Sequence, residues 1–214
     1  MSALSRNDLV FQGAGYTGMR MSAHDFLALG ETRERYELID GVVVMSPSPV
    51  PLHSELVLEV LRQLFLFSVG RERLRVFSET DILLTSGDVY RPDLCIYLPG
   101  RVPPNTPLLD LPPDLVLEVA SPSTKRLDYI TKRDDYEAFG VGEYWIVDAI
   151  QPDGGDQEGR PSRPAPARRT LSVRCWRRQN DRLVATTVEG DSLASVSLPG
   201  FVLDFAPLRA LIEQ

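Results

Sequence analysis

The sequence predicts a mixed α/β fold in which helices cover the faces of one sheet. Two observations lead to this prediction. Short apolar runs typical of buried strands recur between residues 75 and 148, and two longer segments have apolar residues at helical spacing. The 214 residues are enough for one well-buried core, and no change in composition marks a second full domain.

The N-terminal third of the chain predicts two helices and a hairpin. Residues 1–20 show no sustained periodicity and contain three glycines, so we expect a flexible N-terminal arm. Residues 22–30 begin with a capping serine and end with glycine, which predicts a short helix. The dipeptide Asp40-Gly41 between two apolar runs predicts a β-hairpin. A cluster of prolines then leads into an amphipathic helix at residues 52–69.

The central part of the chain predicts the main sheet. We expect strands at residues 75–84, 90–98 and 114–120, a helix at 125–139 that Ser123 or Thr124 caps and Gly140 ends, and a further strand at 143–148.

The C-terminal part predicts an insertion and a second hairpin. Residues 151–169 are rich in proline, glycine, aspartate and arginine, which is typical of a mobile insertion. Alternating residues at 171–177 and 183–189 predict a hairpin, and a short helix follows from about Pro207. We therefore expect a single domain at residues 21–214, interrupted by this insertion.

Composition and charge limit the class of protein. The content of 43% hydrophobic and 25% charged residues is that of a globular chain. Cys95 and Cys175 lie far apart without metal-ligand spacing, which argues against a disulfide framework or a zinc site. The first residues lack the apolar core of a signal peptide, so we expect a cytoplasmic protein. The longest apolar run, residues 56–69, is too short and too polar to span a membrane.

The distribution of charge bears on nucleic-acid binding. A net charge of −7 argues against a uniformly basic surface, which phosphate binding would need. Residues 160–178 nevertheless hold seven arginines and no acid. This basic segment fits either a DNA-facing edge or a solvated linker.

Asp93 and Glu118 each lie on a predicted strand among apolar neighbours. An ionised carboxylate in such surroundings is costly unless a cation or hydrogen-bond donors compensate it. Because side chains alternate along a strand, Asp93 shares its face with Cys95, and Glu118 shares its face with Val116. If the strands are neighbours, both carboxylates can bind one hard cation, Mg²⁺ or Mn²⁺. Such a cation assists phosphodiester hydrolysis by polarising a phosphoryl oxygen and supplying hydroxide.

The helix predicted at residues 125–139 offers a positive charge. Asp128, Lys132 and Tyr136 follow one another at intervals of four residues, so they lie on one stripe. Lys132 facing the carboxylates would stabilise charge that develops in a transition state. Alternatively, Asp128 and Lys132 form an ordinary surface pair.

An ordered set of motifs runs through nearly the whole chain after residue 20. It comprises residues 36–41, residues 46–49, His53, Pro92-Asp93, Glu118-Val119-Ala120, residues 121–124 with Asp128, Lys132 and Tyr136, residues 143–148 and residues 198–201. This set resembles the Uma-type restriction endonuclease family of the PD-(D/E)XK nuclease superfamily. The resemblance implies a restriction-endonuclease-like αβββαβ core, here with an N-terminal β-hairpin and a C-terminal hairpin extension. It also implies that Asp93 and Glu118 are metal ligands.

Three further residues are candidates for the site. Ala120 occupies the position where the superfamily usually has a lysine, so the resemblance makes Lys132 the candidate replacement. Glu37, beside the hairpin turn, either completes an acidic pocket or pairs with an arginine such as Arg35. His53, near a helix start, is either a general base or a capping or packed side chain.

We therefore expect a metal-dependent endonuclease that hydrolyses DNA phosphodiester bonds with an activated water and uses Mg²⁺ or Mn²⁺. Such nucleases often pair to cut two strands, so the resemblance also makes a homodimer a candidate, although the sequence itself does not specify the oligomeric state. Two alternatives stay open. Ala120 and the acidic net charge favour a non-catalytic module that binds nucleic acid or protein on a nuclease scaffold. Two carboxylates also serve glycosidases, which need no metal.

Overall fold

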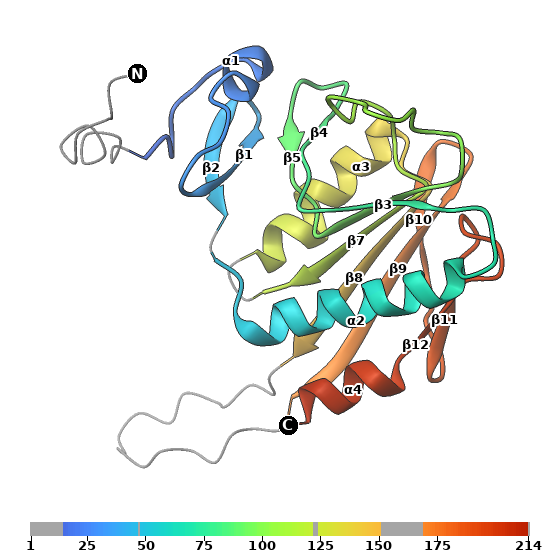
Figure 1. The fold of residues 1–214 in the computed structure, drawn as a ribbon. Coiled ribbons are helices and arrows are strands. Elements are labelled where there is room, and N and C mark those ends of the chain that lie inside the picture. Colours follow the sequence, from blue (N-terminus) through green and yellow to red (C-terminus); the bar gives the residue numbers. More distant parts are fainter. Residues whose placement is uncertain (1–14, 47, 122–123, 151–168, 214) are drawn as a thin grey trace, which may run out of the picture.

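The structure, a computed structural model, describes residues 15–46, 48–121, 124–150 and 169–213. A six-stranded sheet forms the centre of the molecule, with helices on both faces and a four-stranded sheet beside it (Figure 1). This arrangement confirms the predicted mixed α/β fold. None of the helices in the described residues is long and apolar enough to cross a membrane.

The six-stranded sheet has the order β10-β9-β8-β7-β6-β3. Its strands are β3 (Arg75–Ser78), β6 (Leu94–Tyr97), β7 (Leu115–Ala120), β8 (Glu143–Ile150), β9 (Thr170–Gln179) and β10 (Arg182–Thr186). Strands β7 and β8 are parallel, and the other neighbours are antiparallel. Because parallel neighbours need a crossover connection, a helix lies between β7 and β8 in the chain.

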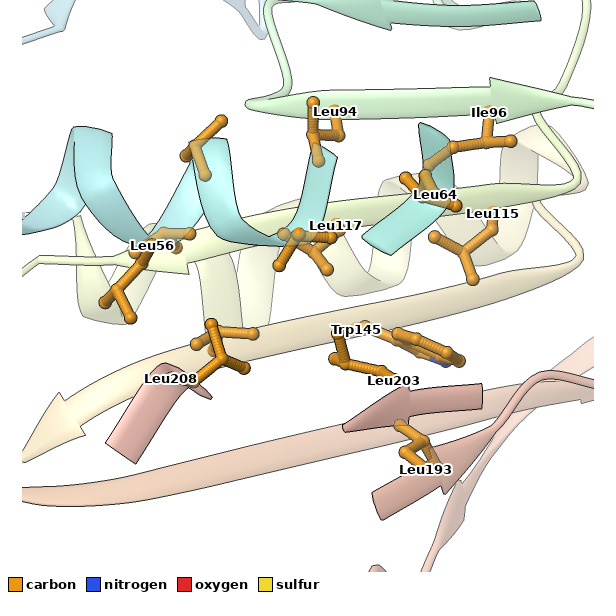
Figure 2. Close-up of a cluster of buried hydrophobic side chains, with 14 of the residues drawn as sticks. Leu56, Leu64, Leu94, Ile96, Leu115, Leu117, Trp145, Leu193, Leu203 and Leu208 are labelled. Carbon is orange, nitrogen blue, oxygen red and sulfur yellow. The ribbon is translucent and has the colours of Figure 1, made fainter. Parts of the chain in front are cut away.

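Each face of this sheet packs against different helices. On one face, Leu94, Leu117 and Trp145 pack against α2 (Pro51–Ser68) and α4 (Ala206–Ile212), as Figure 2 shows for part of this cluster. On the other face lies the crossover helix, which begins with a π-helical segment, η1 (Leu127–Lys132), and continues as α3 (Arg133–Phe139). The helix ends at Gly140, whose φ of 101° is the left-handed conformation expected of a glycine at this position.

The smaller sheet has the order β2-β1-β5-β4. Its strands are β1 (Arg35–Ile39), β2 (Val42–Ser46), β4 (Ile82–Leu83) and β5 (Val89–Tyr90). The predicted turn at Asp40-Gly41 joins β1 to β2, and both residues have positive φ. The short helix α1 (Ala23–Leu27) packs on this sheet through Phe26, and Ser22 caps it by accepting a hydrogen bond from Asp25 N. This sheet forms the lobe at the upper left of Figure 1.

Two predicted strands are interrupted in the structure. Residues 75–84 form β3 and β4, and residues 90–98 form β5 and β6, so each predicted strand contributes to both sheets. Glu79 has a φ of 49°, which breaks the first run, and Pro92, which lacks an N–H, breaks the second.

Other differences lie near the chain ends. In the segment predicted as an arm, Gly18 N donates to Val43 O and Val43 N donates to Met19 O, so residues 18–19 join the β1–β2 unit. Residues 1–14 of the arm and 151–168 of the insertion lie outside the described residues. The second predicted hairpin is β9–β10, although β10 ends at Thr186 instead of residue 189. The sequence did not predict the short pair β11 (Ser192–Ala194) and β12 (Val202–Asp204).

Candidate active site

Asp93 and Glu118 lie side by side at one end of the central sheet. Asp93 precedes β6 and Glu118 lies in β7, where Leu94 of β6 is opposite Leu117 of β7. Asp93 N donates to Glu118 Oε2 at 3.1 Å, and Val119 N donates to Asp93 Oδ2 at 2.7 Å. These reciprocal hydrogen bonds fix both carboxylates against the backbone of the neighbouring strand.

Lys132 lies among the carboxylates and not on the surface. Its Nζ is 2.9 Å from Glu118 Oε1, 3.0 Å from Glu37 Oε1 and 3.7 Å from Asp128 Oδ1. Lys132 is 4% exposed and Asp128 is 2% exposed, so the interpretation of these two residues as a surface pair is wrong. The hydroxyl of Tyr136 donates to Glu118 Oε1 at 3.3 Å. The stripe of Asp128, Lys132 and Tyr136 therefore faces Glu118.

Glu37 comes from β1 of the smaller sheet. Besides contacting Lys132, its Oε1 accepts a hydrogen bond from Arg91 N at 2.8 Å and its Oε2 accepts one from Ser46 Oγ at 3.2 Å. Arg35 pairs instead with Glu79, so the alternative cross-strand pair with Glu37 does not form. The two sheets thus both supply residues to one site.

His53 reaches the same site from the first turn of α2. Its Nε2 is 3.1 Å from Asp93 Oδ2, so the side chain packs against a candidate ligand. Burial lowers the pKa of His53, but the hydrogen bond to Asp93 and its negative charge outweigh burial and raise this pKa above its ordinary value. His53 is therefore positioned to orient the Asp93 carboxylate.

These side chains line an open pocket of about 390 Å³ with an excess of negative charge. Its ionisable lining comprises the acids Glu37, Glu79, Asp93, Glu118 and Asp128 and the bases Arg35, Arg91, Lys132 and His53. Arg91 makes two hydrogen bonds to Asp81, and Arg35 pairs with Glu79, so both arginines already have acidic partners. Among the described residues of the lining, His53 contacts Asp93 and Lys132 contacts the buried carboxylates Glu37, Glu118 and Asp128.

The pKa directions reflect this excess of acids. Burial raises the pKa of Glu118 well above its ordinary value, Lys132 opposes the rise, and Asp93 adds to it. Burial also raises the pKa of Asp128. Burial lowers the pKa of Lys132, but the charges of Glu118, Glu37 and Asp128 outweigh it and raise this pKa, so Lys132 is an ammonium ion. A further cation in the pocket would relieve the repulsion among the carboxylates.

The donor set fits a magnesium-like ion. The described part of the chain contains no group of three or more His, Cys, Asp or Glu side chains that could hold a metal by themselves. Mg²⁺ does not need such a cage, because one or two carboxylates bind it together with water and substrate phosphates. Asp93 and Glu118 supply two carboxylates, and Oδ1 of Asp93 accepts no hydrogen bond from the described residues.

Sequence reasoning missed two features of the site. Asp128 is a buried part of the pocket, and its place on the stripe with Lys132 was the signal for this. Arg91 also lines the pocket, and its position just before the Pro92-Asp93 motif was the available signal.

Of the basic segment at residues 160–178, Arg177 binds Glu143 and Arg178 binds the carbonyl groups of Glu137 and Val141. These two arginines stabilise the fold and do not line the pocket.

Comparisons with known proteins identify the family of this chain and a structure of similar fold. The model of the Uma2 family, described as "Putative restriction endonuclease", matches residues 23–206. A search among curated proteins found no match. A crystal structure described as "a putative nuclease belonging to DUF820", from Anabaena variabilis, is 19% identical, with a TM-score of 0.69 over 90% of this chain and 99% of that chain. This likeness shows a shared nuclease-like fold. Since the family model spans most of the sequence, the chain belongs to the Uma2 family of restriction-endonuclease-like proteins.

Proposed function

We propose that this protein is a metal-dependent endonuclease that hydrolyses DNA phosphodiester bonds. The observation that carries the proposal is the buried ammonium of Lys132 between Glu118 and Glu37, beside Asp93 in an open pocket. A buried ionic cluster of this kind is costly to maintain for stability alone, and such clusters concentrate at functional sites. The family description supports a nuclease.

In this proposal Asp93 and Glu118 would hold Mg²⁺ or Mn²⁺. When bound, such a cation would polarise the phosphoryl oxygen and lower the pKa of a water molecule to the neutral range. Val119 N and His53 keep Oδ2 of Asp93 in place, and Oδ1 would be available to the ion. His53 therefore acts on the orientation of a ligand.

Lys132 would stabilise the negative charge that develops in the transition state. Its ammonium lies 2.9 Å from Glu118 Oε1, so it can reach negative charge that develops beside that carboxylate during attack on phosphorus. Glu37 and Asp128 fix the ammonium from two other directions. Because these contacts exist before substrate arrives, little reorganisation is needed during the reaction.

A cleavage assay tests the proposal. Supercoiled and linear DNA, single-stranded DNA and RNA are incubated with the protein in Mg²⁺, in Mn²⁺ and in EDTA. We expect DNA cleavage in either metal, none in EDTA, and loss of cleavage in folded Asp93→Asn and Glu118→Gln proteins. Asp134→Asn is the matched control, because Asp134 is exposed and pairs only with its neighbour Arg133 among the described residues.

Each other outcome contradicts the proposal in a different way. DNA binding without cleavage in both metals supports the binding-module alternative. Hydrolysis of an aryl glycoside in EDTA, assayed in parallel, supports the glycosidase-like alternative. Cleavage of RNA alone rejects DNA as the substrate.

A further inference from the structure

The ring of Tyr90 lies close to the ammonium of Lys132. Tyr90 ends β5 of the smaller sheet and is fully buried. Lys132 Nζ lies over the ring, 5.6 Å from its centroid. This distance is within the ~6 Å at which the negative face of an aromatic ring attracts a cation, and the attraction is stronger between buried groups such as these. Tyr90 lies outside the motifs that carry the family resemblance, so only the structure reveals this contact.

The pairing of β1 with β5 sets Tyr90 beside Glu37. In this antiparallel pair Leu38 lies opposite Val89, so Glu37 lies opposite Tyr90. The side chains of opposite residues project from the same face of a sheet. Glu37 Oε1 is 3.0 Å from Lys132 Nζ. The carboxylate of Glu37 and the ring of Tyr90 therefore reach the same ammonium from adjacent positions of the smaller sheet.

Two further contacts fix the ring itself. The hydroxyl of Tyr90 donates a hydrogen bond to Asp135 Oδ2 on α3. Burial and this hydrogen bond raise the pKa of Tyr90, so the hydroxyl keeps its proton and stays a donor. The ring of Tyr136 packs edge-on against that of Tyr90, with the centroids 5.7 Å apart. Asp135 and Tyr136 follow Lys132 by three and four residues, about one helical turn. The ring thus connects β5 to the crossover helix (Figure 1).

We propose that Tyr90 is a positioning residue whose ring face keeps the Lys132 ammonium beside Glu118. Attraction between charges depends only on distance, so it does not by itself select one of the three carboxylates near Lys132 Nζ, those of Glu118, Glu37 and Asp128. The ring face restricts the ammonium to one place among them, 2.9 Å from Glu118 Oε1. The inference rests on the proposed function for its effect on catalysis, because a displaced ammonium would stabilise the developing charge less well.

Substitutions that separate the ring from the hydroxyl test the proposal. Tyr90→Phe keeps the ring and loses the hydrogen bond to Asp135, whereas Tyr90→Leu loses the ring. Pentafluorophenylalanine at position 90 keeps the shape of the ring but makes its face positive, so it repels the ammonium. Single-turnover cleavage of DNA in Mg²⁺ gives the rate of the chemical step, and a DNA titration in Ca²⁺ gives the affinity.

We expect an effect on rate and not on affinity. Tyr90→Phe should cleave within about threefold of the wild-type rate, while Tyr90→Leu and the pentafluorophenylalanine protein should cleave at least about tenfold more slowly, the size of one buried cation–π contact. The affinity for DNA should stay the same in all three proteins, because Tyr90 is buried and does not line the pocket.

Tyr97→Leu is the matched control. Tyr97 is also fully buried, belongs to the same apolar cluster as Tyr90, and donates its hydroxyl to Leu111 O, but it does not line the pocket. Its loss should lower the stability of the protein and leave the cleavage rate of the folded protein unchanged. An equal loss of cleavage in Tyr97→Leu would show that Tyr90→Leu acts through general packing, which would overturn the proposal.

Urea unfolding in EDTA tests the contact without using cleavage. Tyr90→Leu should lower the unfolding midpoint less in Lys132→Met than in wild type, because the ring has no ammonium to attract in that background. The pentafluorophenylalanine protein replaces Tyr90→Leu in this cycle where the latter does not fold. A wild-type protein that cleaves no DNA would reject the proposed function, and this cycle would then decide alone whether Tyr90 positions Lys132. Equal midpoint shifts in both backgrounds, wild-type cleavage by the pentafluorophenylalanine protein, or a tenfold loss in Tyr90→Phe would overturn the proposal.

Discussion

Lys132 is the residue on which the candidate site depends. Three carboxylates, Glu118, Glu37 and Asp128, lie within 3.7 Å of its ammonium, and all four side chains are buried. A lysine in a helix is usually solvated, so this burial distinguishes Lys132 from an ordinary surface residue. Ala120 occupies the position where the superfamily usually has a lysine, so β7 carries no positive charge there. Lys132 brings an ammonium group to Glu118 from the neighbouring helix instead.

We predict that Lys132→Met lowers the rate of DNA cleavage by about 10²–10³, the effect of losing one preorganised charge donor. The variant also leaves buried carboxylates without their cation, so its free energy of unfolding in EDTA should fall by about 3 kcal/mol. Single-turnover cleavage and urea unfolding measure the two effects. Lys125→Met is the matched control, because Lys125 is half exposed and pairs with Asp148 outside the pocket. Undiminished cleavage by folded Lys132→Met would remove Lys132 from the mechanism.

The raised pKa of Glu118 predicts how stability varies with pH. In the unfolded chain a glutamate titrates near pH ~4.3. Between that pH and its raised pKa, Glu118 keeps its proton in the folded protein and loses it in the unfolded protein. The free energy of unfolding in EDTA should therefore fall as pH rises from about 4.3 through the raised pKa. Urea titrations across this range should show a smaller fall in Glu118→Gln than in Glu55→Gln. Equal slopes for the two variants would contradict the assignment.

At the scale of elements, two sheets meet at the pocket because two runs of strand are interrupted. The break at Glu79 separates β3 from β4, and the break at Pro92 separates β5 from β6. Asp93 therefore lies where the chain passes from one sheet to the other, and β5 pairs with β1, which carries Glu37. Local patterns predicted the strands, but they do not reveal a change of sheet within one apolar run.

Glu143, at the start of β8, joins the central sheet to the C-terminal segment. It is fully buried, and its Oε2 accepts hydrogen bonds from Ser195 Oγ and from Val196 N and Ser197 N, the last two at 3.1 Å. Its Oε1 is 3.1 Å from Arg177 Nε. This carboxylate satisfies the backbone of the loop between β11 and β12, two strands too short for the sequence pattern to predict.

We predict that Glu143→Gln lowers the free energy of unfolding by about 3 kcal/mol, because a buried charged acceptor loses its charge while Arg177 keeps its own. Asp191→Asn is the comparison: Asp191 pairs with Arg209 at the surface, and its loss should cost less than about 1 kcal/mol. Urea unfolding of both variants measures the difference. Equal losses would show that Glu143 does not anchor the segment.

For the molecule as a whole, apolar periodicity was sufficient for the fold class and the central strands. The sequence left the adjacency of Asp93 and Glu118 conditional on their strands being neighbours, and the pairing of β6 with β7 meets that condition. The contact of Glu37 with Lys132 joins residues far apart in sequence, and so does that of His53 with Asp93. Such contacts depend on how sheets and helices pack, which periodicity does not specify.

Binding of a divalent cation should stabilise the whole protein. At about 100 times its dissociation constant, Mg²⁺ should add about 2.7 kcal/mol to the free energy of unfolding. Asp93→Asn should lose most of this gain, and Asp134→Asn should keep it. Urea unfolding with and without Mg²⁺ measures the gain. The same gain in wild type and Asp93→Asn would place the binding ion elsewhere.

A crystal soaked in Mn²⁺ tests the central claim most directly. Anomalous scattering locates the manganese independently of any activity. We predict a single strong peak in the pocket, within coordination distance of the Asp93 and Glu118 carboxylates, with Lys132 still beside Glu118. The soak uses the manganese concentration and pH of the cleavage assay. Manganese bound elsewhere, or no peak between these two carboxylates, would contradict the account.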